Sequence, residues 1–421
     1  MINPNFSMPI LLTGLIIVSV IFVRIALLQL KIPALIGYIL LGFLIQVLDF
    51  HFGFVSEQTI DVFNFLANIG IITLLFRIGL ESNLKGLFKQ LHHASIIWIV
   101  GVTFNGTLGF LVSRLVLGIP LIPSLFIGTA LTATSVGIPV GIWRRAGAIR
   151  SRRGALLIDV AELNDIFAIV SMILLFTIAP ILNEKSDVSL FPIIVRAITF
   201  LLIKLFLFGT FCVLISLYVE RRLTHSFKQI TKPPNPILVV TGIGFCIAAV
   251  AGLIGFPLAI GAFFAGLVFS RDPDAVKLDI SFDMLYDFFG PFFFIGIGFN
   301  VTPNDIMIGL FLGVIIFSVA VFGNLIGQGI PAFFIDSRNG IWQNGWMSFL
   351  LFGISVIPRA EIAMIIMQRG LHSGNWAVSS KLFNGMVVVS LLTCLTAPIV
   401  IRFLLRKWPQ PPLPVYESAK F

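Results

Sequence analysis

Long apolar runs, interrupted by short groups of Pro, Gly and charged residues, make up most of the 421-residue chain. A helix that crosses a bilayer needs about 20 consecutive, mostly apolar residues. The pattern therefore predicts thirteen spanning segments and an all-α polytopic membrane protein. These segments cover residues 8–30, 33–48, 59–80, 94–117, 122–143, 154–181, 190–219, 236–252, 257–270, 284–302, 305–334, 343–370 and 376–405.

Composition supports the membrane assignment, because 58% of the residues are hydrophobic and only 11% are charged. Soluble domains have about 45–50% apolar and about 25% charged residues, so a water-soluble enzyme is excluded. Intrinsic disorder is excluded as well, since it requires few apolar residues and high net charge. Cys212, Cys246 and Cys394 lie in apolar segments without a CxxC pair, which indicates packing rather than metal or redox chemistry.

The distribution of Lys and Arg predicts the orientation, because basic residues are concentrated in cytoplasmic loops. With the N-terminus outside, 18 of the 28 basic residues fall in inner loops and the tail, and 3 in outer loops. The C-terminus is then cytoplasmic, and the expected location is the bacterial inner (plasma) membrane. The net charge of +9 is typical of such loops, so no nucleic-acid partner is expected.

An internal repeat relates the two halves of the chain. PALIGYILLGFL begins at Pro33 and PLAIGAFFAGLV at Pro257, and the later TSVGIP and SVIP begin at Ser135 and Ser355. The two pairs lie at similar spacings, 102 and 98 residues after their Pro. Under the predicted orientation the repeats run in opposite directions across the membrane. Inverted repeats are typical of secondary transporters, whose sites lie at the midplane where helices are broken.

Two segments contain such breaks. Segment 122–143 contains TATSVGIPVG, and segment 343–370 contains GISVIPRAE. Pro139 and Pro358 each remove a backbone donor and interrupt the helix, and nearby hydroxyls can satisfy the freed groups. These hydroxyls belong to Thr132, Thr134 and Ser135. The breaks predict a transport site, and the alternative is that Pro only kinks each helix.

Three acidic residues, Asp159, Glu162 and Asp165, lie within segment 154–181. Asp165 is about 16 Å deep, near the middle of a core about 30 Å thick. Acids at this depth are costly and usually functional, although an ion pair with another segment is the alternative. Asp159 and Glu162 are shallower and are expected either to line an inner funnel or to pair with the basic residues at 150–153.

A carboxylate beside freed carbonyl and hydroxyl oxygens is a minimal site for H⁺ or a monovalent cation. The prediction is that Asp165 holds one or the other in turn, with no catalytic residue and no cofactor beyond the transported Na⁺ or K⁺ and H⁺.

Seven motifs together resemble the monovalent cation:proton antiporter superfamily, especially its second branch of sodium/proton and Kef-type potassium/proton exchangers. They are LKIPALIGYILLGFLI, LLFRIGLE, TATSVGI, LNDIFAI, LAIGAFFAGLVFS, GPFFFIGIG and PRAEIAMII. The resemblance implies a homodimer, two crossed broken helices in each protomer, and an elevator-like motion of a core domain. It implies a dimerisation domain at 1–90 and 220–303, a core domain at 91–182 and 304–405, a linking helix at 183–219 and a short cytoplasmic tail at 406–421.

The resemblance also implies roles for individual residues. Asp165 would carry the ion and the proton, with Asn164 as its neighbour in the site motif. Thr132, Thr134 and Ser135 would lie at the first break, and Arg359 and Glu361 just past the second, where they would support the site or compensate charge.

The chain departs from the family pattern at several positions. Electrogenic members have Asp where Asn164 stands and Lys where Asn324 is placed. The electroneutral branch has Arg at the latter position and Glu where Val160 stands. Arg77 occupies a usually apolar position and is expected either to pair with Glu81 or to reach the core.

These observations predict a proton-coupled Na⁺ or K⁺ antiporter with electroneutral exchange, because one Asp alternates between two neutral complexes. The alternative is a channel-like potassium efflux protein gated by a separate regulatory subunit. A third hypothesis is an antiporter-like membrane protein without transport activity.

Overall fold

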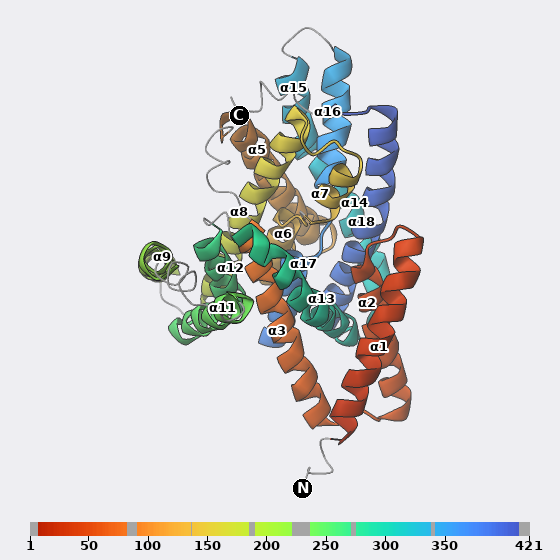
Figure 1. The fold of residues 1–421 in the computed structure, drawn as a ribbon, viewed down its shortest axis with the longest axis vertical. Helices are drawn as coiled ribbons and strands as arrows, with labels where there is room; N and C mark the ends of the chain where they lie inside the picture. The colour runs from red at the N-terminus through yellow and green to blue at the C-terminus, as the bar shows by residue number, and fades with distance from the viewer. Residues whose placement is uncertain are drawn as a thin grey trace, which may run out of the picture. The chain divides into compact units, whose positions relative to one another are not determined.

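The computed structural model describes residues 7–81, 91–135, 137–184, 190–220, 236–270, 275–337 and 342–411. Every regular element in these ranges is a helix, as the apolar pattern predicts. Parts of the predicted inner loops, at 82–90, 221–235, 271–274 and 338–341, lie outside the described residues, as does the predicted tail from residue 412 onward. The chain divides into two compact units, and Figure 1 shows the helices of both.

The first unit comprises residues 1–29, 37–83 and 186–300. Its helices are α1 (Ser7–Gln29), most of α2 (Ala34–Phe52), α3 (Glu57–Glu81), α9 (Leu190–Leu214), the π-helix η3 (Ile215–Glu220), α11 (Pro236–Ile254), α12 (Leu258–Phe269) and α13 (Ala275–Phe299).

The second unit comprises residues 30–36, 84–185 and 301–421. Its helices are α5 (Leu91–Leu111), η2 (Val112–Val116), α6 (Leu121–Thr132), α7 (Gly137–Arg145), α8 (Arg152–Asn183), η4 (Pro303–Asp305), α14 (Ile306–Asn324), η5 (Leu325–Gly329), α15 (Ile330–Ser337), α16 (Trp342–Ser355), α17 (Glu361–Ser373) and α18 (Ser380–Lys407).

Each of the thirteen predicted segments corresponds to a helix or to consecutive helices. Within the described ranges, nine helical stretches are long and apolar enough to cross a membrane, and three shorter apolar helices accompany them. Two predicted segments are interrupted: 122–143 is divided into α6 and α7, and 343–370 into α16 and α17. The all-α fold and the positions of both breaks are therefore confirmed.

In the first unit, α3 packs against α12 and α13. At their crossing, a Cβ on Gly266 would overlap the backbone of α3, so a larger residue would separate the helices. Arg77 on α3 forms an ion pair with Glu81 at 2.8 Å and lies over the Tyr286 ring, 4.8 Å from its centroid. The predicted pairing with Glu81 is confirmed, and the aromatic contact further accommodates the charge.

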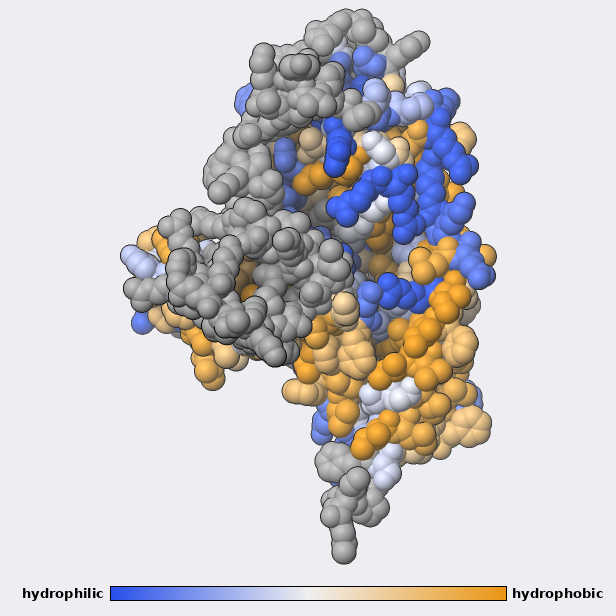
Figure 2. Space-filling view, in the orientation of Figure 1, coloured by the Kyte–Doolittle hydropathy of each residue, from blue (hydrophilic) through white to orange (hydrophobic). Residues whose placement is uncertain are grey.

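Helix α1 exposes most of its apolar side chains, including Leu11, Leu15 and Phe22. Figure 2 shows the corresponding hydrophobic surface in orange over the part of the view where Figure 1 places α1. Hydrocarbon-facing helices have such surfaces because lipid, rather than protein, covers them.

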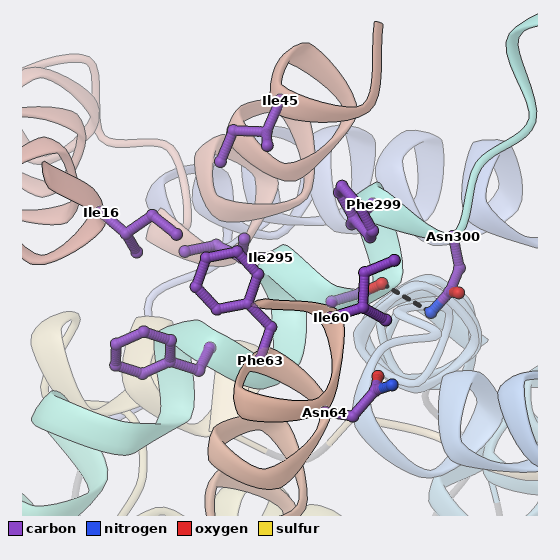
Figure 3. Close-up of a pocket in the computed structure, with 10 residues that line it drawn as sticks. Ile16, Ile45, Ile60, Phe63, Asn64, Ile295, Phe299 and Asn300 are labelled. Carbon is purple, nitrogen blue, oxygen red and sulfur yellow. Dashed lines mark hydrogen bonds between the residues drawn. The ribbon is translucent and has the colours of Figure 1, made fainter. Parts of the chain in front are cut away.

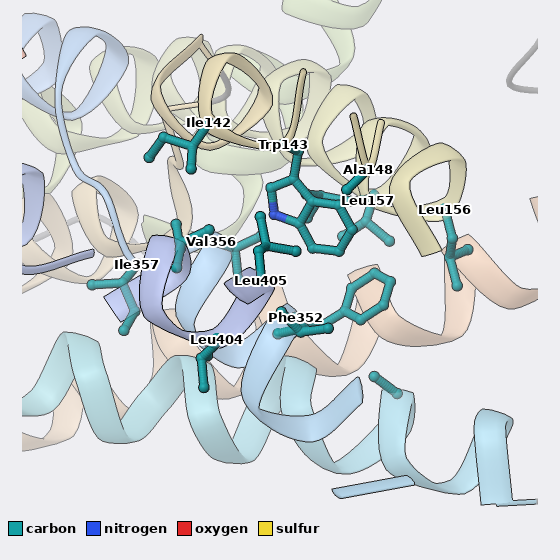
Figure 4. Close-up of a cluster of buried hydrophobic side chains, with 14 of the residues drawn as sticks. Ile142, Trp143, Ala148, Leu156, Leu157, Phe352, Val356, Ile357, Leu404 and Leu405 are labelled. Carbon is teal, nitrogen blue, oxygen red and sulfur yellow. The ribbon is translucent and has the colours of Figure 1, made fainter. Parts of the chain in front are cut away.

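The second unit has a core cluster centred on Trp143, shown in Figure 4. Its members come from α5, α7, α8, α15, α16 and α18 and from the segment after α16. The Trp143 indole is fully buried and donates a hydrogen bond to the Ser355 hydroxyl at 3.0 Å. This bond connects α7, which follows the first break, to the end of α16, where the second break begins.

The N-terminus of α8 is held by polar contacts within the same unit. Arg153 donates from Nε to Asp336 at 2.7 Å and to Ser348 at 2.7 Å, and from Nη1 to Gln410 at 2.8 Å. These partners lie on α15, on α16 and after α18. Because α8 carries the three acids predicted from sequence, the network fixes the end of the helix on which the site is built.

Candidate functional site

The first break lies between α6 and α7. Helix α6 ends at Thr132, Ala133 is extended, and α7 begins at Gly137. The Thr132 hydroxyl donates to the carbonyl of Thr129 at 2.7 Å, whereas the buried hydroxyls of Thr134 and Ser135 have no hydrogen-bond partner. The break thus presents two uncommitted hydroxyl oxygens in a buried position.

The second break separates α16, which ends at Ser355, from α17, which begins at Glu361. Pro358 lies within it, and its carbonyl accepts a hydrogen bond from the Ser135 N–H at 2.8 Å. The two breaks are therefore in direct backbone contact, although more than 200 residues separate them in the sequence. This contact agrees with the two crossed broken helices that the family resemblance implies.

Arg359 connects the same two segments through its side chain. Its guanidinium is fully buried and donates from Nη1 to the carbonyl of Ala133 at 2.6 Å and to that of Val356 at 3.3 Å. Its backbone N–H donates to the Thr393 hydroxyl of α18 at 3.0 Å. The predicted supporting role agrees with this geometry, because a charged donor satisfies carbonyls that broken helices leave free.

Asp165 and Asn164 lie on α8, which contacts both α6 and α17. Asp165 follows the first residue of α8 by 13 positions, or about 20 Å along the helix. Its side chain is 5% exposed, and Asn164 is fully buried. Among the described residues, Asp165 Oδ1 and both polar atoms of the Asn164 amide have no hydrogen-bond partner. Within the described ranges no basic side chain pairs with Asp165.

Acidic neighbours surround Asp165 on two sides. Glu361, the first residue of α17, and Glu162, one turn earlier on α8, interact electrostatically with its carboxyl group. Asp159, a further turn back, interacts with Glu162 in the same way. Negative charges on neighbouring carboxylates repel one another. A proton or a cation bound at Asp165 therefore relieves its repulsion with Glu162 and Glu361.

The orphaned polar atoms indicate the chemistry of the site. Buried polar groups in native proteins are almost always hydrogen-bonded, so a group of unsatisfied ones requires an explanation. Here they are mostly oxygens, from Thr134, Ser135, Asn164 and Asp165. Hard cations prefer carboxylate, carbonyl and hydroxyl oxygen ligands. The donor set therefore fits a monovalent cation or a proton as the transported substrate.

Asn324 is a predicted site residue, but none of its described contacts is with either break. It ends α14, and its Oδ1 accepts a hydrogen bond from Asn105 Nδ2 of α5 at 2.9 Å. Each amide also donates to a carbonyl of its own helix, Asn105 to Gly101 and Asn324 to Ala320. Both side chains are buried, so this position holds a neutral pair of amides.

Asn105 was not predicted from the sequence, although a polar residue within the apolar segment 94–117 is a usable signal. Its neighbour Gly106 lies against the first break, where an added Cβ would come within 3.0 Å of Thr132 Cγ2. At the same crossing, a Cβ on Gly128 would come within 2.9 Å of the Gly106 carbonyl. Only glycine permits α5 to approach α6 this closely, so Asn105 is positioned by the packing of the break.

A separate pocket in the first unit is shown in Figure 3. Isoleucine and phenylalanine side chains dominate its lining, and Asn64 and Asn300 contribute its polar groups. The Asn300 amide donates to the Gly296 carbonyl at 2.8 Å. Because the lining residues carry no charge, this pocket lacks a group that could exchange a cation for a proton.

Comparison with known proteins identifies the family of the chain. The sodium/hydrogen exchanger transmembrane family matches residues 15–407, which is nearly the whole chain. The chain belongs to this family. It is an integral membrane transporter rather than an enzyme, and the resemblance of the seven sequence motifs to the monovalent cation:proton antiporter superfamily is confirmed.

Individual relatives share about a quarter of their residues with this exchanger-family chain. A high-affinity Na⁺/H⁺ antiporter of Synechocystis sp. is 27% identical over 349 residues, 81% of this chain and 71% of the relative. A Na⁺/H⁺ antiporter of Enterococcus hirae is 27% identical over 379 residues, 89% and 92% of the two chains. A Na⁺/H⁺-K⁺ antiporter of Bacillus cereus is 25% identical over 374 residues, 88% and 89%.

The fold is also similar to that of a solved exchanger. The structure of the sodium proton antiporter MjNhaP1 of Methanocaldococcus jannaschii at pH 8 matches with a TM-score of 0.68, over 96% of this chain and 99% of that one. Sequence identity over the match is 14%, so the likeness concerns the fold. The helical architecture of this exchanger family is thus present in the chain.

Proposed function

We propose that this protein exchanges a monovalent cation, Na⁺ or K⁺, for H⁺ across the membrane. The observation that carries the proposal is a buried Asp165 with no basic partner in the described chain, on a helix that contacts both broken segments. Membership of the sodium/hydrogen exchanger family supports cation/proton exchange. The names of the relatives include both Na⁺ and K⁺, so the proposal keeps both ions.

Exchange follows from competition for one carboxyl group. A proton from one side neutralises Asp165, and on the other side the proton leaves and a cation takes its place. Asn164, Thr134 and Ser135 supply further oxygens, because their polar atoms are buried and uncommitted. Arg359 keeps the two breaks together by binding the Ala133 carbonyl, so the oxygens of both segments stay in register.

Alternating access completes the proposal. We infer that the second unit, which contains both breaks and α8, carries the site from one face of the membrane to the other in an elevator-like motion. The first unit would form the stationary scaffold of a homodimer in a bacterial inner membrane, with the N-terminus outside and the C-terminus in the cytoplasm. The clear division into two units supports this proposal, since an elevator requires a separable carrier.

The deciding experiment is exchange in proteoliposomes that contain a trapped pH-sensitive dye. Addition of Na⁺, K⁺ or Li⁺ outside is expected to drive cation entry in exchange for lumenal protons, so that the trapped dye reports a cation-dependent rise in lumenal pH. The Asp165→Asn variant is expected to lose this response by at least about a hundredfold, because the amide can neither bind a proton at neutral pH nor neutralise a cation.

The matched control is Asp61→Asn, which removes an exposed carboxyl group of α3 in the first unit. It is expected to leave exchange within about twofold of the unmodified protein. Cation flux without any pH change would instead indicate the channel-like alternative with a separate regulatory subunit. Equal activity of Asp165→Asn and the unmodified protein would contradict the proposal.

A further inference from the structure

Three arginines gather at one end of the second unit without an acidic partner. Arg145 is the last residue of α7, and Arg402 and Arg406 lie in the last two turns of α18. Arg402 interacts electrostatically with both Arg145 and Arg406. None of the three forms an ion pair with a carboxylate in the described ranges. The cluster therefore concentrates positive charge that no carboxylate of the described residues neutralises.

A backbone contact holds the central arginine of this cluster. Arg402 Nη2 donates to the carbonyl of Lys31, in the turn between α1 and α2. Lys31 has a φ of 59°, and no other described residue except glycine has a positive φ. This left-handed conformation is uncommon for a residue with a side chain, and here it accompanies the carbonyl contact to Arg402. Lys31 is itself exposed, so a fourth basic residue is part of this contact.

An apolar strip on α18 leads directly to the arginines. Ile399 and Phe403 are 58% and 63% exposed, and they lie on the same face of the helix as Arg402 and Arg406 because of their spacing of three or four residues. At the end of the helix, Lys407 lies 5.2 Å from the centroid of the Trp408 ring. Trp and Lys in this arrangement are typical of a helix end at the level of the lipid headgroups.

We propose that Arg145, Arg402 and Arg406 form a binding site for the phosphate of an anionic phospholipid, with an acyl chain lying along Ile399 and Phe403. Charge complementarity favours this occupant, because a phosphate relieves the repulsion among the guanidinium groups and accepts several of their hydrogen bonds. The adjoining apolar strip favours a lipid over free phosphate, which would bind only the charged part of the surface. The site shares no residue with the proposed ion site.

Lipid-dependent stability of the purified full chain tests the proposal and does not depend on transport. Thermal unfolding is measured in a neutral detergent during titration with phosphatidylglycerol or with phosphatidylcholine. Phosphatidylglycerol is expected to raise the midpoint of the unmodified protein in a saturable manner, and phosphatidylcholine is not. Arg402→Gln with Arg406→Gln is expected to weaken the apparent affinity for phosphatidylglycerol by about fivefold for each removed charge.

The matched control is Lys381→Gln, which removes an exposed basic charge from the other end of α18. Lys381 lies 21 residues, or about 32 Å, from Arg402 along the same helix. Its loss is expected to leave the response to phosphatidylglycerol unchanged. An equal loss in both variants would overturn the proposal, because it would indicate general attraction between basic residues and anionic lipid.

Two further measurements distinguish a bound lipid from free phosphate and from a second copy of the chain. Inorganic phosphate at the same concentrations is expected to leave the unfolding midpoint unchanged, and an equal effect of free phosphate would overturn the lipid assignment. The oligomeric state of the arginine variant is measured by light scattering and is expected to match that of the unmodified protein. Dissociation of the variant with an unaltered lipid response would indicate that this surface contacts a second copy instead.

Discussion

Arg359 shows at the scale of one residue how a charged group is accommodated in the core of this protein. A buried guanidinium is costly unless hydrogen bonds replace its hydration. Here the carbonyls of Ala133 and Val356 supply part of that replacement, and the two other guanidinium nitrogens, Nε and Nη2, have no partner among the described residues. The same bonds satisfy carbonyls that no helix can satisfy. The arginine and the two breaks therefore depend on each other.

Replacement of Arg359 by Gln is expected to lower the free energy of unfolding by about 1.5–3 kcal/mol, because hydrogen bonds from a charged donor to buried carbonyls are lost. Thermal or denaturant unfolding in detergent, followed by tryptophan fluorescence, measures the change. Arg369→Gln on the exposed part of α17 is the control, and a surface change of this kind is expected to stay within about 0.5 kcal/mol. Similar losses in both variants would contradict the proposed role.

Much of the site at this scale follows from the sequence, because depth along a helix can be counted in residues. Asp165 stands out as an acid near the middle of an apolar segment, and the hydroxyls near Pro139 mark the first break. Of the predicted hydrogen bonds from these hydroxyls to backbone groups, only that of Thr132 is present among the described residues, because Thr134 and Ser135 are left without a partner there. The placement of Asn324 could not be predicted in the same way. Its hydrogen bond to Asn105 joins positions 219 residues apart, and no local pattern specifies that distance.

At the scale of elements, α5 connects the ion site to α14. Gly106 on α5 lies against the first break, and Trp98 meets the ring of Phe167 on α8 edge-on at 5.8 Å. Asn105 lies on the same helix and binds Asn324, directly before the π-helix η5. The sequence predicts one continuous segment at 305–334, whereas the structure has α14, η5 and α15. The π-helix packs closely against α5, with Gly327 next to Gly101, and an apolar pattern does not reveal such a contact.

The pair of amides gives a test of this connection. Asn105→Leu alone leaves Asn324 with a buried, unsatisfied oxygen and is expected to cost about 1–3 kcal/mol of stability. The double variant Asn105→Leu with Asn324→Leu removes both partners. Its free energy of unfolding is expected to lie close to that of the unmodified protein, so its loss is much smaller than that of the single variant. The free energies of unfolding of the unmodified protein, the two single variants and the double variant together form a double-mutant cycle. Additive losses in the double variant would show that the bond contributes nothing.

At the scale of the whole molecule, the stoichiometry of exchange depends on how many acids carry a proton with each cation. Asp165 has no acidic neighbour at position 164, and the Asn105–Asn324 pair adds no charge. The complex of Asp165 with a cation is therefore neutral, as is protonated Asp165. We accordingly propose electroneutral exchange of one cation for one proton, with Glu162, Glu361 and Asp159 keeping their protonation state throughout.

This proposal predicts no transport current during cation exchange on a solid-supported membrane, while the dye assay of the same proteoliposomes shows proton movement. Asn164→Asp places a second carboxyl group beside Asp165 at a fully buried position. Like charges at this distance favour protonation of one of them, so the variant is expected to move a second proton and to generate a current. A current from the unmodified protein that scales with an imposed membrane potential would mean that Glu162 or Glu361 also releases its proton. Glu162→Gln and Glu361→Gln would then identify the second carrier, because only loss of the responsible group would abolish the current while exchange continues.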